Sequence, residues 1–130
     1  MNLNKITFFA AFLTALGVAL GAFGAHALKE TLLSHGTTET WKTAVLYHLL
    51  HGVAAWACLS GAARPSPLLV KSASAWLIGI LLFSGSLYIL ALGGPRWVGP
   101  VTPLGGLAFI VGWLMAARAG WMGNSPNTDD

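Results

Sequence analysis

The chain has 130 residues and a mass of 13.6 kDa, which is enough for one domain. Hydrophobic residues make up 55% of it and charged residues only 8%, against about 25% charged residues in an ordinary soluble domain. So few charged side chains cannot cover the surface of a small globule, and the mean hydropathy is +0.69, so we expect an integral membrane protein. The single cysteine, Cys58, argues against a disulfide scaffold. The net charge of +3 comes without a basic cluster, so we expect no nucleic-acid partner.

Four stretches of the chain contain no Asp, Glu, Lys or Arg: residues 6–28, 43–63, 72–95 and 97–117. Each is 21 to 24 residues long, and about 20 apolar residues in a helix cross the roughly 30 Å hydrocarbon core of a bilayer. Because the backbone must hydrogen-bond to itself in lipid, these stretches predict helices. We therefore predict an all-α, four-helix transmembrane bundle, a polytopic integral membrane protein whose surroundings are the lipid bilayer.

Local signals refine the ends of these helices. Gly36 has the position of a residue that ends a helix, and Thr37 and Thr38 are N-cap candidates for the second span. Thr102 followed by Pro103 predicts an N-cap and first residue for the fourth helix. We expect one membrane domain over residues 1–122, with helices at about 6–28, 40–63, 72–93 and 103–121, and a polar C-terminal tail at 123–130.

The first span also imitates a secretory signal, since Lys5 precedes an apolar run that ends in Ala25-His26-Ala27. We expect a retained helix, because the run is longer than the usual ~7–15 residues and three further spans follow. The following loop, residues 29–42, alternates in charge and suggests a half-turn of amphipathic helix at the interface, with a partner-docking loop as the alternative.

Four spans place both termini on one side of the membrane. The Lys and Arg residues divide four to three between the sides: Lys5, Arg64, Lys71 and Arg118 with the termini, and Lys29, Lys42 and Arg96 opposite. Because cytoplasmic loops carry the excess of Lys and Arg, we predict cytoplasmic N- and C-termini.

Small residues recur at helical spacing in three spans, where they would let neighbouring backbones approach closely. The candidates for helix packing are Gly17, Gly21, Gly24, Gly79, Gly85, Gly105 and Gly112. Gly17 and Gly21 form a G-x-x-x-G motif, which we interpret as an intramolecular contact because a four-helix chain supplies its own neighbours. A homo-oligomer or a membrane-protein partner is the alternative.

A polar layer is predicted in one half of the bilayer, from residues that counting at 1.5 Å per residue brings to similar depth. Its members are His26, Tyr47, His48, His51, Ser84, Ser86 and Tyr88. Tyr47, His48 and His51 share one side of the second helix, because they are spaced i,i+3 and i,i+4. The opposite half is nearly all apolar, so this layer is the candidate site.

Three interpretations of the polar layer stay open. In the leading one, neutral histidines hydrogen-bond to Ser84, Ser86 or Tyr88 and hold the helices in register. In the second, His48, His51 and His26 bind a metal, haem or small ligand, although no cysteine or carboxylate lies at matching depth. In the third, the layer belongs to a proton or small-solute transport component, although its polar groups stop halfway across.

No catalytic constellation is visible in the sequence. It contains no buried carboxylate pair, no nucleophile beside an orienting base and no phosphate-binding loop at a helix start. We therefore predict that the protein is not an enzyme, assign no catalytic residue and no metal ligand, and expect no cofactor. The leading hypothesis is a non-enzymatic accessory or structural membrane protein.

Four blocks of the chain resemble the signature blocks of one family. They are GAFGAHAL at residues 21–28, TAVLYHLLH at 43–51, FSGSLY at 83–88 and TPLGG at 102–106. In this order they are similar to the YgdD/YwdK-type small inner-membrane proteins, a family with a domain of unknown function. The resemblance runs from about residue 5 to residue 121. It implies a four-span protein of the bacterial inner membrane and implies no activity, substrate or cofactor.

Overall fold

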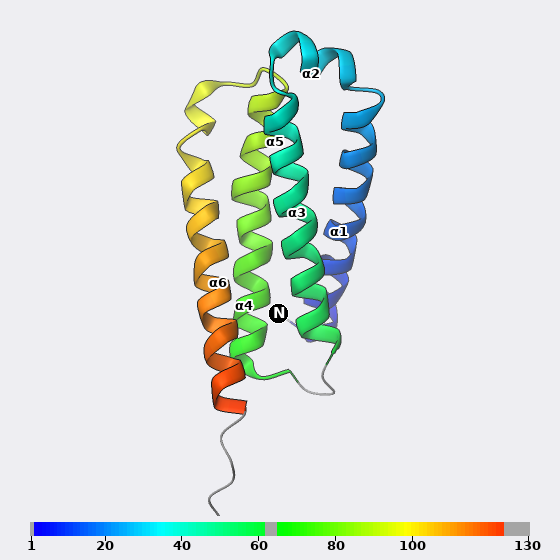
Figure 1. Ribbon diagram of the computed structural model, residues 1–130. Helices are drawn as coiled ribbons and strands as arrows, with labels where there is room; N and C mark the ends of the chain where they lie inside the picture. Colours follow the sequence, from blue (N-terminus) through cyan, green and yellow to red (C-terminus); the bar gives the residue numbers. More distant parts are fainter. Residues whose placement is uncertain (1, 62–64, 124–130) are drawn as a thin grey trace, which may run out of the picture.

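The structure is a computed structural model that describes residues 2–61 and 65–123. Within those ranges four helical spans are long and apolar enough to cross a membrane. Three are α1 (Leu3–Ala25), α3 (Thr38–Ser60) and α6 (Val101–Gly123); the third span in chain order comprises α4 (Pro67–Gly79), the π-helical η1 (Ile80–Ser84) and α5 (Gly85–Ala91). They stand side by side, with the start of α1 and the end of α6 at the same end (Figure 1). The predicted four-helix transmembrane architecture is confirmed.

Three helices begin earlier than the charge-free stretches predicted. α1 includes Lys5, α3 includes Glu39 and Lys42, and the third span includes Lys71. Ser66 caps the third span, since its side chain accepts from the Leu69 N–H and Pro67 follows as the first helical residue. A lysine near a helix end can place its ammonium group among the lipid headgroups while its aliphatic stem stays in the apolar region. The charge-free stretches therefore miss the starts of three helices, while the first and third stretches run past the ends of their helices at Ala25 and Ala91. The predicted tail beyond Gly123, the end of the predicted second helix and Arg64 lie outside the described residues.

A short helix, α2 (Lys29–His35), joins the first two spans and lies across one end of the bundle (Figure 1). Gly36 ends it in the left-handed conformation with φ of 64°, the role predicted for this glycine. Thr37 precedes α3, but its hydroxyl donates to the Ala91 carbonyl at 2.7 Å instead of capping the helix. The turn between α2 and α3 is thereby tied to the end of the third span.

The start of α6 differs from the prediction. After a 3-10 turn, η2 (Arg96–Val98), the helix begins at Val101, so Thr102 lies inside it and is not its N-cap. The Thr102 N–H bonds to the Gly99 carbonyl at 3.1 Å, which continues the turn into the helix. The Thr102 side chain is left to bond elsewhere, to Ser86.

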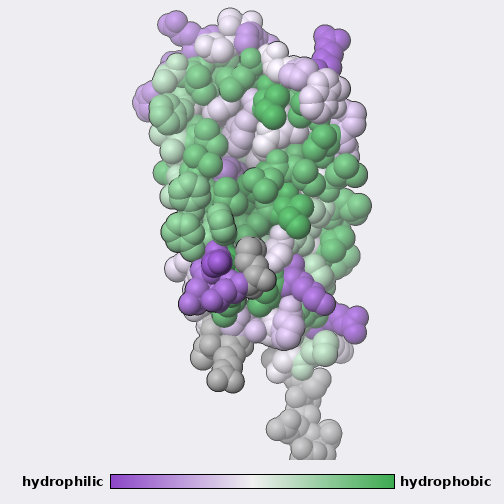
Figure 2. Space-filling model, turned by 180° about the vertical axis from the view of Figure 1, so that it is seen from behind, coloured by the Kyte–Doolittle hydropathy of each residue, from purple (hydrophilic) through white to green (hydrophobic). Residues whose placement is uncertain are grey.

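The spans pack in the order α1, α3, third span, α6, so that α3 and the third span are central (Figure 1). α1 packs chiefly on α3, and α6 packs chiefly on α4 and η1. The outer helices keep large apolar side chains exposed, among them Phe8 and Phe12 on α1 and Leu107 and Leu114 on α6. Figure 2 shows the same division from behind, as an apolar band between two polar ends. This is the surface expected of a protein surrounded by lipid.

Two buried clusters hold the bundle together. The larger one centres on Trp76, which is fully buried, and the smaller one lies below α2 around Trp41. The larger cluster is built from Ile6, Ala10, Ala55, Leu59, Ala73, Trp76, Leu77, Ile80 and Phe109.

Six of the seven glycines singled out in the sequence lie against a neighbouring helix. A Cβ at any of them would come within 3.3 Å of an atom of another helix; they are Gly17, Gly21, Gly24, Gly79, Gly105 and Gly112. Gly85 differs, because a Cβ there would approach only the Ile80 carbonyl of its own span, at 3.9 Å. The close approach of the helices therefore depends on glycine at these six contacts.

Candidate functional site

His51 is the most completely engaged of the polar residues and lies in α3 with 3% of its surface exposed. Its Nδ1 is 2.8 Å from the Tyr47 carbonyl, and the Trp113 Nε1–H of α6 donates to its Nε2 at 3.1 Å. A carbonyl only accepts and an indole N–H only donates, so the ring is neutral with its hydrogen on Nδ1. Both ring nitrogens of His51 therefore have partners.

The His51 ring is also packed face to face against a neighbouring aromatic ring. Its centroid lies 3.6 Å from that of Phe109 in α6, and the two planes differ by 12°. Trp76 and Trp113 flank it at centroid distances of 6.5 and 6.1 Å. His51 thus joins α3 to α6 by stacking and by a hydrogen bond, in the middle of the bundle.

His48 connects α3 to the third span, one turn from His51 and 2% exposed. Its Nδ1 lies 3.1 Å from the Tyr88 hydroxyl, one of the three partners predicted for the histidines. Its Nε2 is buried and has no hydrogen-bond partner among the described residues. The adjacent Cδ2 faces α1, since a Cβ on Gly17 would lie 3.2 Å from it. This orphaned nitrogen is the one unsatisfied group of the histidine pair.

The two serines bond to other helices and not to the histidines. The Ser84 hydroxyl donates to the Ala44 carbonyl of α3 at 2.8 Å. Ser86 donates to the Phe83 carbonyl at 2.9 Å and lies 2.6 Å from the Thr102 hydroxyl, which must then be the donor to Ser86. Hydrogen bonds of this layer therefore link the third span to both of its neighbours.

The polar layer is positioned by a π-helical segment in the third span. In η1 the Gly85 N–H bonds to the Ile80 carbonyl, five residues back. This wider turn comes immediately before Gly85 and includes Ser84, whose hydroxyl reaches α3. π-Helical turns are rare and occur frequently at functional positions. The sequence analysis did not predict this π-helical turn.

Two predicted members of the layer lie differently from the rest. His26 is exposed, just after the end of α1, and the structure does not bring it to His48 or His51. Tyr47 is 38% exposed, and its ring packs on Phe83 at 4.7 Å. His26 is separated because α1 ends at Ala25 and the chain turns into α2. Counting along the chain gives a depth but not a direction around the helix axis.

Three hydrogen-bonding residues of the layer were not in the predicted set. Trp113 and Thr102 contribute from α6, and Trp41 of α3 donates to the Leu20 carbonyl of α1 at 3.0 Å. A signal exists for Trp41, since a buried indole N–H needs an acceptor, but the half-exposed Trp113 gives no such signal. Among residues 2–61 and 65–123, no group of three His, Cys, Asp or Glu side chains is placed to hold a metal ion.

Comparisons with known proteins agree with this architecture. A family model described as "Protein of unknown function (DUF423)" matches residues 20–106. The UPF0382 membrane protein YwdK of Bacillus subtilis is 42% identical over 80% of this chain and 85% of its own. The UPF0382 inner membrane protein YgdD of Escherichia coli is 40% identical over 88% of each chain. No solved structure matches the chain.

Proposed function

The chain belongs to the DUF423 family of UPF0382 membrane proteins, and we propose that it is a non-enzymatic accessory or structural protein of the bacterial inner membrane. In this proposal the buried polar layer specifies which helices pack together and in what register. The observation that carries it is His51, whose two ring nitrogens are both used within the bundle. An imidazole engaged in this way has no lone pair left for a substrate or a metal.

The other hydrogen bonds support the same role because they join neighbouring helices pairwise. Trp41 links α3 to α1, His48 and Ser84 link α3 to the third span, and Ser86 links the third span to α6. Each bond of this kind is worth about 0.6–2 kcal/mol in a membrane. Apolar side chains alone discriminate weakly between packings in lipid, so a polar layer selects one arrangement.

Ligand binding is the second candidate function, and one observation favours it. His48 Nε2 has no hydrogen bond of good geometry among the described residues, although the Leu13 backbone of α1 lies near the imidazole, so this nitrogen is the one that a metal, haem or small ligand entering the bundle would reach. The donors nearby argue against a site with several protein ligands, because His51 is engaged on both nitrogens and His26 is exposed elsewhere. A packing role for the polar layer therefore remains the better-supported proposal.

We predict that the protein extracted from membranes in mild detergent carries no stoichiometric metal and shows no Soret band. Metal analysis and an absorbance spectrum of the same sample measure both. The control is the double variant His48→Ala/His51→Ala, which is expected to give the same baseline as the wild type. A bound metal or a Soret band that this double variant loses would contradict the packing proposal in favour of ligand binding.

We further propose that both termini face the cytoplasm. The support is the excess of Lys and Arg on the side of the termini, which includes Lys5, Lys71 and Arg118. A phosphatase reporter, which is active only in the periplasm, is expected to be inactive when fused after Asp130. The same reporter in the α2–α3 turn after Gly36 is expected to be active, and the reverse pattern would overturn this orientation.

A further inference from the structure

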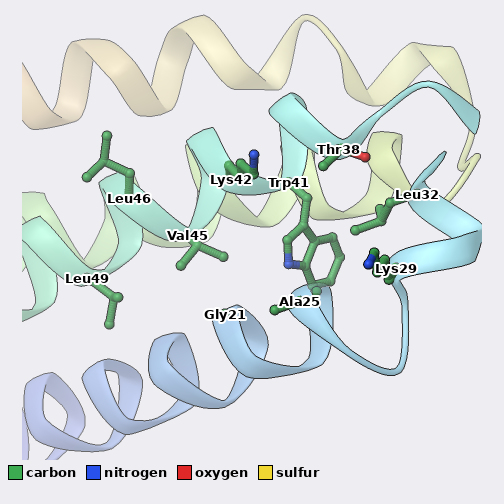
Figure 3. A pocket seen from close by; sticks show the side chains of 11 residues that line it. Gly21, Ala25, Lys29, Leu32, Thr38, Trp41, Lys42, Val45, Leu46 and Leu49 are labelled. Carbon is green, nitrogen blue, oxygen red and sulfur yellow. The ribbon is translucent and has the colours of Figure 1, made fainter.

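A groove of about 500 Å³ lies between α1 and α3, below α2. Figure 3 shows it from close by, with the Trp41 indole projecting from α3 toward α1. The side of the groove on α1 is formed by residues with little or no side chain: Gly21, Gly24 and Ala25. Its volume is within the range of about 300–1,000 Å³ that is usual for small-ligand pockets. The groove is lined almost entirely by apolar atoms. None of the polar-layer residues lines it.

The charges of the groove are confined to one end of it. Lys29 of α2 and Lys42 of α3 line that end, while the acidic residues there, Glu30 and Glu39, do not line the groove. Lys42 pairs with Glu39 at 2.8 Å, but both side chains are largely exposed, so this ion pair is weak and readily exchanged. Among the described residues Lys29 forms no ion pair, and an anion in the groove would compete with Glu39 for Lys42, so this end of the groove is complementary to an anion.

The opposite end of the groove lies at hydrocarbon depth. Leu49 is seven residues further along α3 than Lys42, which is about 10 Å along the helix axis. Val45 and Leu46 line the interval. Two lysines at one end of an apolar groove are complementary to a molecule with an anionic head and a hydrocarbon tail.

We propose that this groove binds one anionic phospholipid of the surrounding bilayer. Its phosphate lies between Lys29 and Lys42, and one acyl chain lies in the groove along Val45 and Leu49. This proposal goes beyond the packing role of the histidine layer and does not depend on it.

The test is a lipid titration of the full-length protein in detergent, with bound lipid counted by native mass spectrometry. Phosphatidylglycerol and phosphatidylcholine with the same acyl chains serve as probes. We expect one phosphatidylglycerol to bind at least about fivefold more tightly than phosphatidylcholine, because each lysine near an anionic headgroup contributes about a fivefold preference. Inorganic phosphate alone is expected not to compete, since it lacks the chain that fills the groove.

Two pairs of variants locate the binding. Lys29→Gln/Lys42→Gln is expected to abolish the preference for phosphatidylglycerol, whereas Lys5→Gln/Lys71→Gln, with lysines at the opposite end, is expected to keep it. Ala25→Phe is expected to weaken the binding of both lipids severalfold, because the phenyl ring would fill the groove. Ala22→Phe, on an exposed part of α1 that does not line the groove, is expected to leave both unchanged.

Several outcomes would overturn the proposal. They are equal binding of the two lipids by the wild type, an equal loss in the Lys5/Lys71 variant, and competition by inorganic phosphate. Binding of neither lipid would also overturn it and would leave the groove to another occupant. The lysines and both alanines are exposed, so the variants are expected to fold. A melting temperature for each, measured without added lipid, verifies this.

Discussion

Gly105→Ala is expected to destabilise the bundle by about 2–3 kcal/mol, because the added Cβ meets backbone and not a flexible side chain. A Cβ at this position would lie 2.3 Å from the Phe83 nitrogen and 2.7 Å from its Cα. The η1 segment of the third span would have to move away from α6, and the Ser86–Thr102 bond would weaken with it. The free energy of unfolding, measured by SDS titration in mixed micelles, gives the loss.

The neighbouring glycine supplies the matched control. A Cβ on Gly106 would lie 3.7 Å from Phe83, an ordinary van der Waals distance. Gly106→Ala has the same change in intrinsic helix propensity as Gly105→Ala, so the difference between the two isolates the steric effect. We expect Gly106→Ala to stay within about 0.5 kcal/mol of the wild type or to stabilise slightly. Equal losses in both variants would show that α6 does not approach the third span as closely as described.

His51→Ala is expected to lower the free energy of unfolding by about 3 kcal/mol, the lower end of the range found when a large buried ring is truncated. The variant loses the stacking on Phe109, loses the hydrogen bond from Trp113, and leaves a cavity in the centre of the bundle. His51→Phe keeps a ring for the stack and loses the hydrogen bonds, so we expect it to cost about 1–2 kcal/mol. The same SDS titration measures both variants.

The control for these variants is the exposed histidine. His26→Ala is expected to change the free energy of unfolding by less than about 0.5 kcal/mol, since its side chain lies outside the bundle. The order of stability is therefore wild type and His26→Ala together, then His51→Phe, then His51→Ala. If His51→Phe were as unstable as His51→Ala, the contribution of ring stacking would be refuted.

The polar layer was predictable in part, and the errors have a common cause. Spacing along α3 correctly turned His48 and His51 inward, and counting depth along the third span selected Tyr88, which bonds to His48. The prediction did not find Trp113 as the partner of His51, and it included His26, which lies outside the bundle. The depth of a residue and the side of the helix it faces can be deduced from the sequence of that helix alone. A hydrogen bond between helices also depends on their rotation and separation.

The amino-acid sequence alone determined the class, the number of spans and their approximate extent. This was possible because a bilayer sets a length and an apolar composition for each helix independently of the others. Only the tertiary structure decided that α1 lies beside α3 and away from α6, and that the third span contains a π-helical turn at Ile80–Ser84. Those choices depend on how closely backbones approach at contacts such as Gly105 with Phe83. Such contacts are set by residues far apart in the chain, and no local pattern encodes them.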